Sequence, residues 1–289
     1  AKFVEATPGV SSVEPLVIPW DEAPRKFQTM VAGGTPPDVI TMGMSQWDFA
    51  AKGAFVDLNP YVQRDRIDLS EWDPAAIEAY TVHPRGDMLY GLPFGLNTQA
   101  MVYNKTLLEQ AGVEPPPHDW KDTSWTWEAF LEKTAKVTSG EGVAKTWGTT
   151  GIGGNWLLPW VYGGAWVDST GKEIMADAEQ SMMGFQFNYD LLHKHKVMPS
   201  ASESQALANG FLSGKVGMYT DGTWAAGTLS KITDFEWDVA PVPYAAGTDQ
   251  RGAFARRIER VTAGGGKEAQ SVDDVAHQAP VGVAAHRID

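Results

Sequence analysis

Apolar residues recur with helical spacing in several segments, and short apolar runs follow these segments. Phe27, Met30 and Val31 stand at i, i+3 and i+4, the spacing of one helix face. Residues 39–42 (VITM) then read as a short buried strand. Between them, GGTPP ends the helix, because glycine adopts the left-handed conformation at a helix end and proline cannot continue the helix. A phosphate-binding loop runs from strand to helix and ends in Gly-Lys-Ser/Thr. This stretch runs from helix to strand and lacks that ending, so it is not a phosphate-binding loop.

The same alternation of helices and strands recurs further along the chain. We predict a short capped helix at residues 106–112, a helix that Thr126 caps, and a long helix that begins at Asp177. A strand at residues 216–219 leads through a turn to a new helix at Thr223. In the long helix the predicted buried stripe is Met182, Phe185, Tyr189 and Leu192. This alternation is typical of an α/β fold with mainly parallel sheets flanked by helices.

Composition narrows the function classes. The 289 residues are 43% hydrophobic and 20% charged, which is typical of a soluble globular protein. A formal charge of −13 argues against nucleic acid and against anionic lipid as partners. Because the chain has no cysteine, disulfides, zinc–thiolate sites and thiol catalysis are excluded. No apolar run approaches the roughly 20 residues that span a bilayer. The 12 tryptophans could be core residues, but flat aromatic faces also suit sugar rings.

Four segments resemble one protein family in order and spacing. They are AGGTPPDVITMGMSQWDFAAKGAFVDLNPYV, LYGLPFGLNTQAMVYNKTLLEQAGVEPP, SWTWEAFLEKTAKVT and FLSGKVGMYTDGTWAAG. Together they resemble the extracellular solute-binding proteins of bacterial ABC importers, in the carbohydrate-binding family that includes maltose-binding protein. The resemblance covers roughly residues 1–254.

The resemblance implies a type II periplasmic-binding-protein fold, with two α/β lobes and a ligand cleft that closes by hinge motion. Lobe one would comprise residues 1–100 and lobe two residues 101–240. Residues 241–254 would form the return crossover to lobe one. Residues 255–289 contain no aromatic residue and no clear periodicity, so we expect an atypical, weakly folded tail.

Both ends of the chain depart from the family pattern. Family members begin with a signal peptide and a first strand, whereas AKFVEATPGV resembles the end of the first helix. The segment RRIERVTAGGGKEAQ does not match the strand and helices that follow in the family. We therefore expect a chain truncated at the N-terminus, and divergent or frame-shifted after about residue 254.

Polar and aromatic residues at element ends are the candidate ligand contacts. Gln46 and Trp47 open the helix after the strand at residues 39–42, although Trp47 could instead pack beneath its own helix. The crossover contains Asn97, Thr98 and Gln99, and the resemblance implies that a polar side chain here reaches the sugar. We favour Asn97 or Thr98.

Three further candidates lie in the expected second lobe. Trp156 and Trp160 are four residues apart, hence on one helix face, with one expected to contact the ligand and the other to pack in the core. We favour Trp156 as the stacking platform that the resemblance implies. Trp224 matches the aromatic that the family delivers to the sugar from a strand-to-helix turn. Asp221 either binds a hydroxyl group or caps the following helix.

The remaining aromatic and histidine residues that we considered are expected to have structural roles. Trp120, Trp125 and Trp127 are expected to pack, and Tyr90 and Tyr103 to be buried. His193 and His195 are two positions apart on a predicted helix and point in different directions, so no metal site is predicted. No catalytic residue and no cofactor are predicted either.

The resemblance implies a binding protein that captures a mono- or oligosaccharide and delivers it to the membrane subunits of an ABC permease. Its expected location is periplasmic or extracellular, with a lipid anchor in the full-length protein left open, and it is expected to be a monomer. Two alternatives remain: a glycoside hydrolase with tryptophan subsites, and a truncated fragment that does not bind. The sequence has no pair of carboxylates at matching strand ends, and this argues against the hydrolase.

Overall fold

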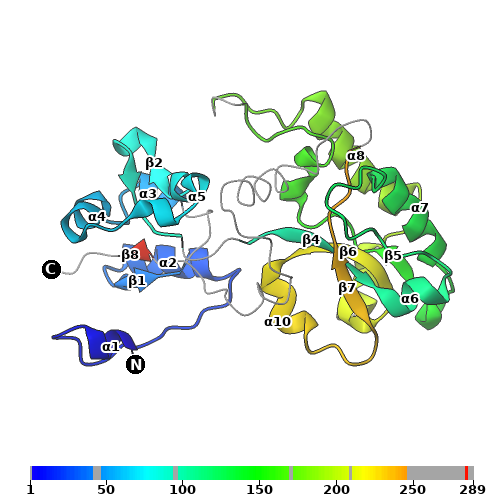
Figure 1. Ribbon diagram of the computed structural model, residues 1–289, viewed down its shortest axis with the longest axis horizontal. Helices are drawn as coiled ribbons and strands as arrows, with labels where there is room; N and C mark the ends of the chain where they lie inside the picture. The colour runs from blue at the N-terminus through cyan, green and yellow to red at the C-terminus, as the bar shows by residue number, and fades with distance from the viewer. Residues whose placement is uncertain are drawn as a thin grey trace. The chain divides into compact units, whose positions relative to one another are not determined.

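The computed structural model describes residues 2–41, 47–93, 97–168, 172–207, 210–245 and 284–285. The chain divides into two compact units, Ala1–Leu96 with Ala279–Asp289, and Asn97–Gln278 (Figure 1). Each unit combines helices with β-sheet, which confirms the α/β class. The expected lobe limits stay a prediction, because most residues after 245 lie outside the described part.

The first unit consists of short helices around small sheets. Its α-helices are α1 (Lys2–Ala6), α2 (Ala23–Ala32), α3 (Trp47–Ala51), α4 (Asn59–Asp65) and α5 (Pro74–Glu78), with 3-10 helices η2 (Leu69–Glu71) and η3 (His83–Arg85). Its strands are β1 (Val39–Ile40), β2 (Thr81–Val82), β3 (Met88–Leu89) and β8 (Ala284–Ala285). The core is aromatic: the Phe27 and Phe55 rings stack at 5.3 Å between centroids, and Phe55 stacks on Tyr90 at 5.7 Å. Tyr90 is buried, as predicted.

The glycine-rich stretch is a helix-to-strand junction, as predicted. Helix α2 ends at Ala32, Gly33 caps it, and Gly34 adopts the left-handed conformation with φ of 71°. The prediction of a buried strand was wrong, because the Val39 side chain is 52% exposed. Strand β1 pairs antiparallel with β8, its one neighbour among the described strands, so little packs against it.

An exposed histidine joins two acidic residues in the first unit. His83 Nδ1 lies 2.7 Å from Asp87 Oδ1, and its Nε2 lies 2.6 Å from Glu78 Oε1. The hydrogen bonds to Asp87 and then to Glu78 raise the pKa of His83 above its ordinary value. The ring therefore ties the end of α5 to the turn after η3, most strongly in its protonated form.

This contact predicts a pH-dependent stability. A histidine whose pKa is raised on folding stabilises the folded state. This stabilisation is fully present below the unfolded pKa of about 6.5 and is lost as the pH rises through the folded pKa. We expect His83→Gln to lower the melting temperature at pH 5.5 but not at pH 9. Melting curves of both proteins across this range check the prediction, and an equal difference at every pH would contradict it.

The second unit is built on one mixed sheet. Its strands are β4 (Gln99–Asn104), β5 (Trp147–Thr149), β6 (Val216–Gly222) and β7 (Trp237–Ala240), in the order β5-β6-β4-β7. Its α-helices are α6 (Lys105–Gln110), α7 (Trp127–Val137), α8 (Glu179–His193), α9 (Ala201–Ala206) and α10 (Ala226–Leu229). Its 3-10 helices are η4 (Gly142–Ala144), η5 (Asn155–Trp160), η6 (Gly210–Ser213) and η7 (Thr223–Ala225). Of all helices in the described ranges, none combines the length and apolarity that a membrane crossing requires.

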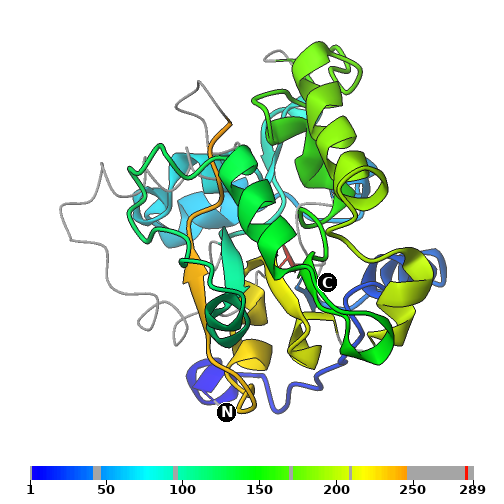
Figure 2. The same ribbon diagram turned by 90° about the vertical axis from the view of Figure 1, so that its right-hand side faces the viewer.

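The expectation of mainly parallel sheets was wrong for the described strands. Strand β5 runs parallel to β6, but β4 is antiparallel to both β6 and β7. It follows that β5, β6 and β7 point the same way, and that β4 is inserted between β6 and β7 in the opposite direction (Figure 2). The pattern of apolar residues identifies a strand but not its direction, so the sequence missed the inversion of β4.

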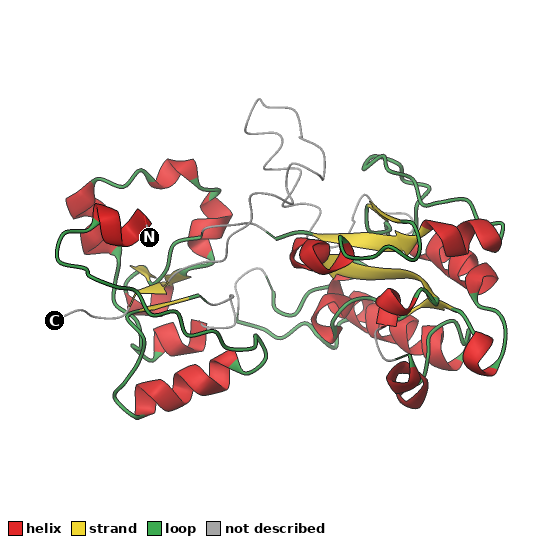
Figure 3. Cartoon of the chain, turned by 90° about the horizontal axis from the view of Figure 1, so that it is seen from below, coloured by secondary structure: helices red, strands yellow, loops and turns green. Residues whose placement is uncertain are grey.

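Successive residues of β4 face two different hydrophobic clusters. Met101 and Tyr103 belong to one cluster and Val102 to the other, so the clusters cover opposite faces of the sheet. Figure 3 shows the strands of this sheet and the helices around them. The first contains the buried Trp125 and Trp127, which confirms their predicted packing role, while Trp120 is 40% exposed. Burial, followed by the Asp238 carboxylate, raises the pKa of the buried Tyr103 to about 12.

The predicted buried stripe of the long helix α8 was wrong for Met182 and Tyr189, whereas Phe185 is half-buried against the first cluster. Met182 and Tyr189 are 50% and 57% exposed, whereas the buried residues of the helix are Ser181, Gly184 and Leu191. A Cβ atom at Gly184 would collide with the backbone oxygen of Leu158 in η5. Backbone-to-backbone approach through small residues therefore selects the face that α8 buries, rather than the largest apolar side chains.

Candidate functional site

The start of β4 and the end of β6 bring together most of the predicted contacts in the second unit. Gln99 pairs with Gly222, so the residues just before β4 lie beside those just after β6. The Thr223 hydroxyl donates to Asn97 Oδ1 at 2.9 Å, and the Thr223 amide donates to the Thr98 carbonyl at 3.0 Å. Asn97 is exposed and Thr98 is half-buried. Asn97 and Thr98 are thereby fixed against the turn that carries Trp224.

Trp224 presents an indole face to solvent. Its side chain is 56% exposed, and a Cβ atom at Gly222 would collide with its six-membered ring. The indole therefore lies against the backbone of Gly222, a position that only glycine leaves open. A broad, partly exposed aromatic surface held in this way is suited to stacking on an apolar ring face.

Asp221 is engaged by its neighbours. Its Oδ1 accepts a hydrogen bond from the Gly222 amide at 2.8 Å, and its carboxylate is also hydrogen-bonded to the Tyr219 side chain. Burial, followed by the nearby Asp221 charge, raises the pKa of Tyr219. The structure shows no side-chain cap from Asp221 to η7, whose N-cap is Gly222. By strand alternation Asp221 faces away from the side of the sheet on which Gln99 lies.

Trp156 lies in η5, a 3-10 helix rather than the α-helical face expected. It is 42% exposed, Trp160 is half-buried, and their rings meet edge to face at 6.0 Å. The glycine turn before Trp156 approaches the same sheet end, because a Cβ atom at Gly153 would lie 2.9 Å from Thr220 Oγ1. Trp156 is thus carried to the neighbourhood of Thr220 and Gln99.

The remaining two candidates, Gln46 and Trp47, belong to the first unit. Trp47 begins α3 and is 42% exposed. Gln46 lies outside the described residues. Both stay predictions.

Two polar residues at this sheet end were missed or set aside at the sequence level. Gln99 and Thr220 are each 5% exposed, and the register of β4 and β6 places them diagonally on one face. Gln99 was visible as the third polar residue of the crossover. Thr220 carried no such signal, because it reads as an ordinary strand residue until the register is known.

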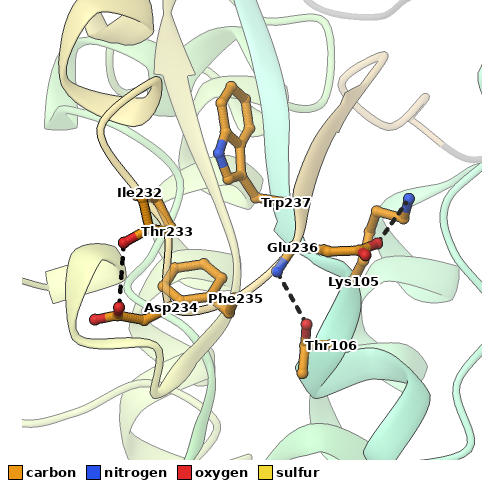
Figure 4. A pocket seen from close by; sticks show the side chains of 8 residues that line it. All are labelled: Lys105, Thr106, Ile232, Thr233, Asp234, Phe235, Glu236 and Trp237. Atoms are coloured by element: carbon orange, nitrogen blue, oxygen red, sulfur yellow. Dashed lines mark hydrogen bonds and ion pairs between the residues drawn. The ribbon is translucent and has the colours of Figure 1, made fainter.

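A cavity of about 650 Å³ lies at the opposite end of β4. Figure 4 shows its lining: Lys105, Thr106, Ile232, Thr233, Asp234, Phe235, Glu236 and Trp237. Its polar groups already bind one another: Lys105 pairs with Glu236 at 3.4 Å, and the Glu236 amide donates to Thr106 Oγ1 at 3.0 Å. We rank it below the Trp224 end of the sheet, since Lys105 and Glu236 pair with each other and the cavity contains none of the predicted contacts.

The described residues contain no group of three or more histidine, aspartate or glutamate side chains placed to hold a metal ion. The His193 ring instead packs against Tyr189, with 4.1 Å between ring centroids and the ring planes tilted by 31°. At the Trp224 end, amides, hydroxyls and indoles lie beside the Asp221 carboxylate, a set that is suited to neutral ligands rich in hydroxyl groups.

Comparison with known proteins connects this geometry to a family. The bacterial extracellular solute-binding protein family matches residues 1–258. The maltotriose-binding protein of Pyrococcus abyssi is 23% identical over 219 residues, which cover 75% of this chain and 44% of that protein.

Two solved structures show the same fold. A substrate-binding protein of Listeria monocytogenes, in complex with cycloalternan, has a TM-score of 0.73 at 24% identity. The GacH receptor of Streptomyces glaucescens, solved unliganded and with acarbose, has a TM-score of 0.68 at 28% identity. Each alignment covers 85% of this chain and 62% of the other. The chain thus spans less than half of the Pyrococcus protein and under two thirds of each solved structure.

Proposed function

This chain belongs to the bacterial extracellular solute-binding proteins, and we propose that it captures a sugar and delivers it to the membrane subunits of an ABC importer. Its α/β units have the type II fold of that family. The sugar is a mono- or oligosaccharide. The place of action is the periplasm or the cell exterior, and the protein acts as a monomer.

The observation that carries this proposal is the exposed Trp224 indole, held over Gly222 beside Asn97 and Thr98. A sugar ring offers one apolar C–H face and a rim of hydroxyl groups. Trp224 stacks on the face, while Asn97 and Thr98 bind the rim. Trp156 extends the aromatic surface, and Asp221 positions Gly222 under the indole. Since each hydrogen bond contributes only about 0.5–1.5 kcal/mol, several such contacts act together.

The named relatives support a carbohydrate ligand. The Pyrococcus protein binds maltotriose by name, and the GacH receptor was solved with acarbose. The arabinooligosaccharide-binding protein of Bacillus subtilis, 27% identical over 112 residues, points to the same ligand class.

The family consists of binding proteins, and we propose that this chain also makes and breaks no covalent bond. The hydrolase alternative requires two carboxylates roughly 5–10 Å apart across a glycosidic bond. At the Trp224 end Asp221 accepts from the Gly222 amide and from Tyr219, and we assign these contacts to positioning rather than to catalysis.

The test is a thermal-shift screen of the chain against a panel of neutral sugars, followed by chromatography of each hit. We expect at least one sugar to raise the melting temperature and to change tryptophan fluorescence, while the sugar is recovered intact. A sugar bound at 100 times its Kd stabilises by about 2.7 kcal/mol. Hydrolysis of the hit, or stabilisation only by charged ligands, would contradict the proposal.

A further inference from the structure

Gln99 and Thr220 form a buried polar pair on one face of the central sheet of the second unit. Thr220 pairs with Met101 and Gln99 with Gly222, so Gln99 and Thr220 are diagonal neighbours. The same register places the position of the Gly222 Cβ on this face, and the Trp224 indole occupies that position. The polar pair therefore adjoins the indole that we assign to sugar stacking.

The Thr220 hydroxyl is unsatisfied. Its Oγ1 is buried and has no hydrogen-bond partner among the residues that the structure describes. Gln99 is 5% exposed and lies diagonally beside Thr220 on the same face of the sheet. By contrast, the buried Thr134 hydroxyl donates to the Leu131 carbonyl at 2.9 Å. Burying an unpaired hydroxyl opposes folding, so Thr220 calls for an explanation beyond stability.

A glycine turn covers the pair. Gly153 has φ of 50°, and a Cβ atom there would lie 2.9 Å from Thr220 Oγ1 and 3.6 Å from Gln99 Oε1. Gly151 also has a positive φ, and Gly154 follows directly. The backbone of this turn can shift at low conformational cost, because glycine accepts both signs of φ. A displacement of this turn away from Thr220 would expose the hydroxyl.

We propose that Gln99 and Thr220 are specificity-determining residues of the sugar site. Together they hydrogen-bond one hydroxyl group of the ligand beneath the Gly153 turn. This inference rests on the proposed function. A glutamine amide and a threonine hydroxyl can each donate and accept, which matches a sugar hydroxyl that does both. Because neither side chain carries a charge, the pair selects a neutral hydroxyl group over a phosphate or a carboxylate.

The test is Thr220→Val, which removes the hydroxyl and keeps the shape of the side chain. We expect its affinity for the sugar found in the screen to fall about tenfold, measured by calorimetry on the full chain. We expect its melting temperature to rise by about 2–4 °C, because an unpaired buried hydroxyl is removed. Thr220→Ser keeps the hydroxyl and should retain most of the affinity.

Thr134→Val is the matched control, since it removes a buried hydroxyl that is hydrogen-bonded within α7. It should lower the melting temperature and leave the affinity unchanged. If Thr220→Val binds the sugar as tightly as the wild type, or if Thr220→Ser loses as much affinity as Thr220→Val, the inference is overturned. If Thr220→Val lowers the stability and leaves the affinity normal, the hydroxyl is hydrogen-bonded to water in the wild type, and the inference is likewise overturned. A wild type that binds no sugar would overturn the proposed function, and this inference with it.

Discussion

Replacement of Trp224 by alanine should weaken sugar binding about 30-fold, or about 2 kcal/mol, while the second unit keeps nearly its full stability. The loss is large because a stacking aromatic combines apolar contact area with a fixed orientation. The effect on folding is small because the side chain is 56% exposed. Calorimetric titration with the sugar from the panel measures the first quantity, and thermal unfolding measures the second.

Trp237→Ala is the matched control for Trp224→Ala. Trp237 is half-buried at the opposite end of the same sheet, where it lines the 650 Å³ cavity. Its replacement should leave the affinity for sugar unchanged, at a moderate loss of stability. If Trp237→Ala abolishes binding and Trp224→Ala does not, the sugar binds in that cavity instead.

The largest effect on stability is expected from Gly184→Ala. The new methyl group would collide with the backbone oxygen of Leu158, and backbone in a packed core cannot yield as a flexible side chain does. We expect the free energy of unfolding of the second unit to fall by about 3 kcal/mol, which corresponds to about 10 °C in melting temperature. Differential scanning calorimetry of the full chain provides the measurement.

Gly227→Ala serves as its control. Gly227 lies within α10, and a Cβ atom there would meet nothing within 4 Å. Because alanine is the better helix former, this variant should be stabilised by about 0.5–1 kcal/mol. Equal destabilisation by both substitutions would show that contact with Leu158 does not explain the requirement for glycine at position 184.

Local features of the fold could be predicted from the sequence. The periodicity of residues 27–31 and the glycines after Ala32 identified α2 and its end, and Thr126 caps α7 by accepting from the Ala129 amide. Strand direction and the buried face of α8 could not be predicted. Both depend on contacts between distant segments: the insertion of β4 between β6 and β7, and the approach of Gly184 to η5.

The candidate site divides in the same way. The family resemblance, together with their position at the ends of strands, selected Asn97, Thr98 and Trp224 as candidates. Thr220 became visible only through the pairing of β4 with β6, and its unpaired hydroxyl only through the structure. The position of Trp224 over Gly222 likewise required coordinates, since the sequence shows a glycine there but not what fills the space of its missing side chain.

The most direct test is a crystal structure of the protein with the sugar that the panel identifies. We expect an intact sugar whose C–H face stacks on Trp224, with hydroxyl groups hydrogen-bonded to Asn97 and Thr98. A sugar bound among Lys105, Thr233 and Trp237 at the other end of the sheet, with the Trp224 indole bare, would contradict the assignment.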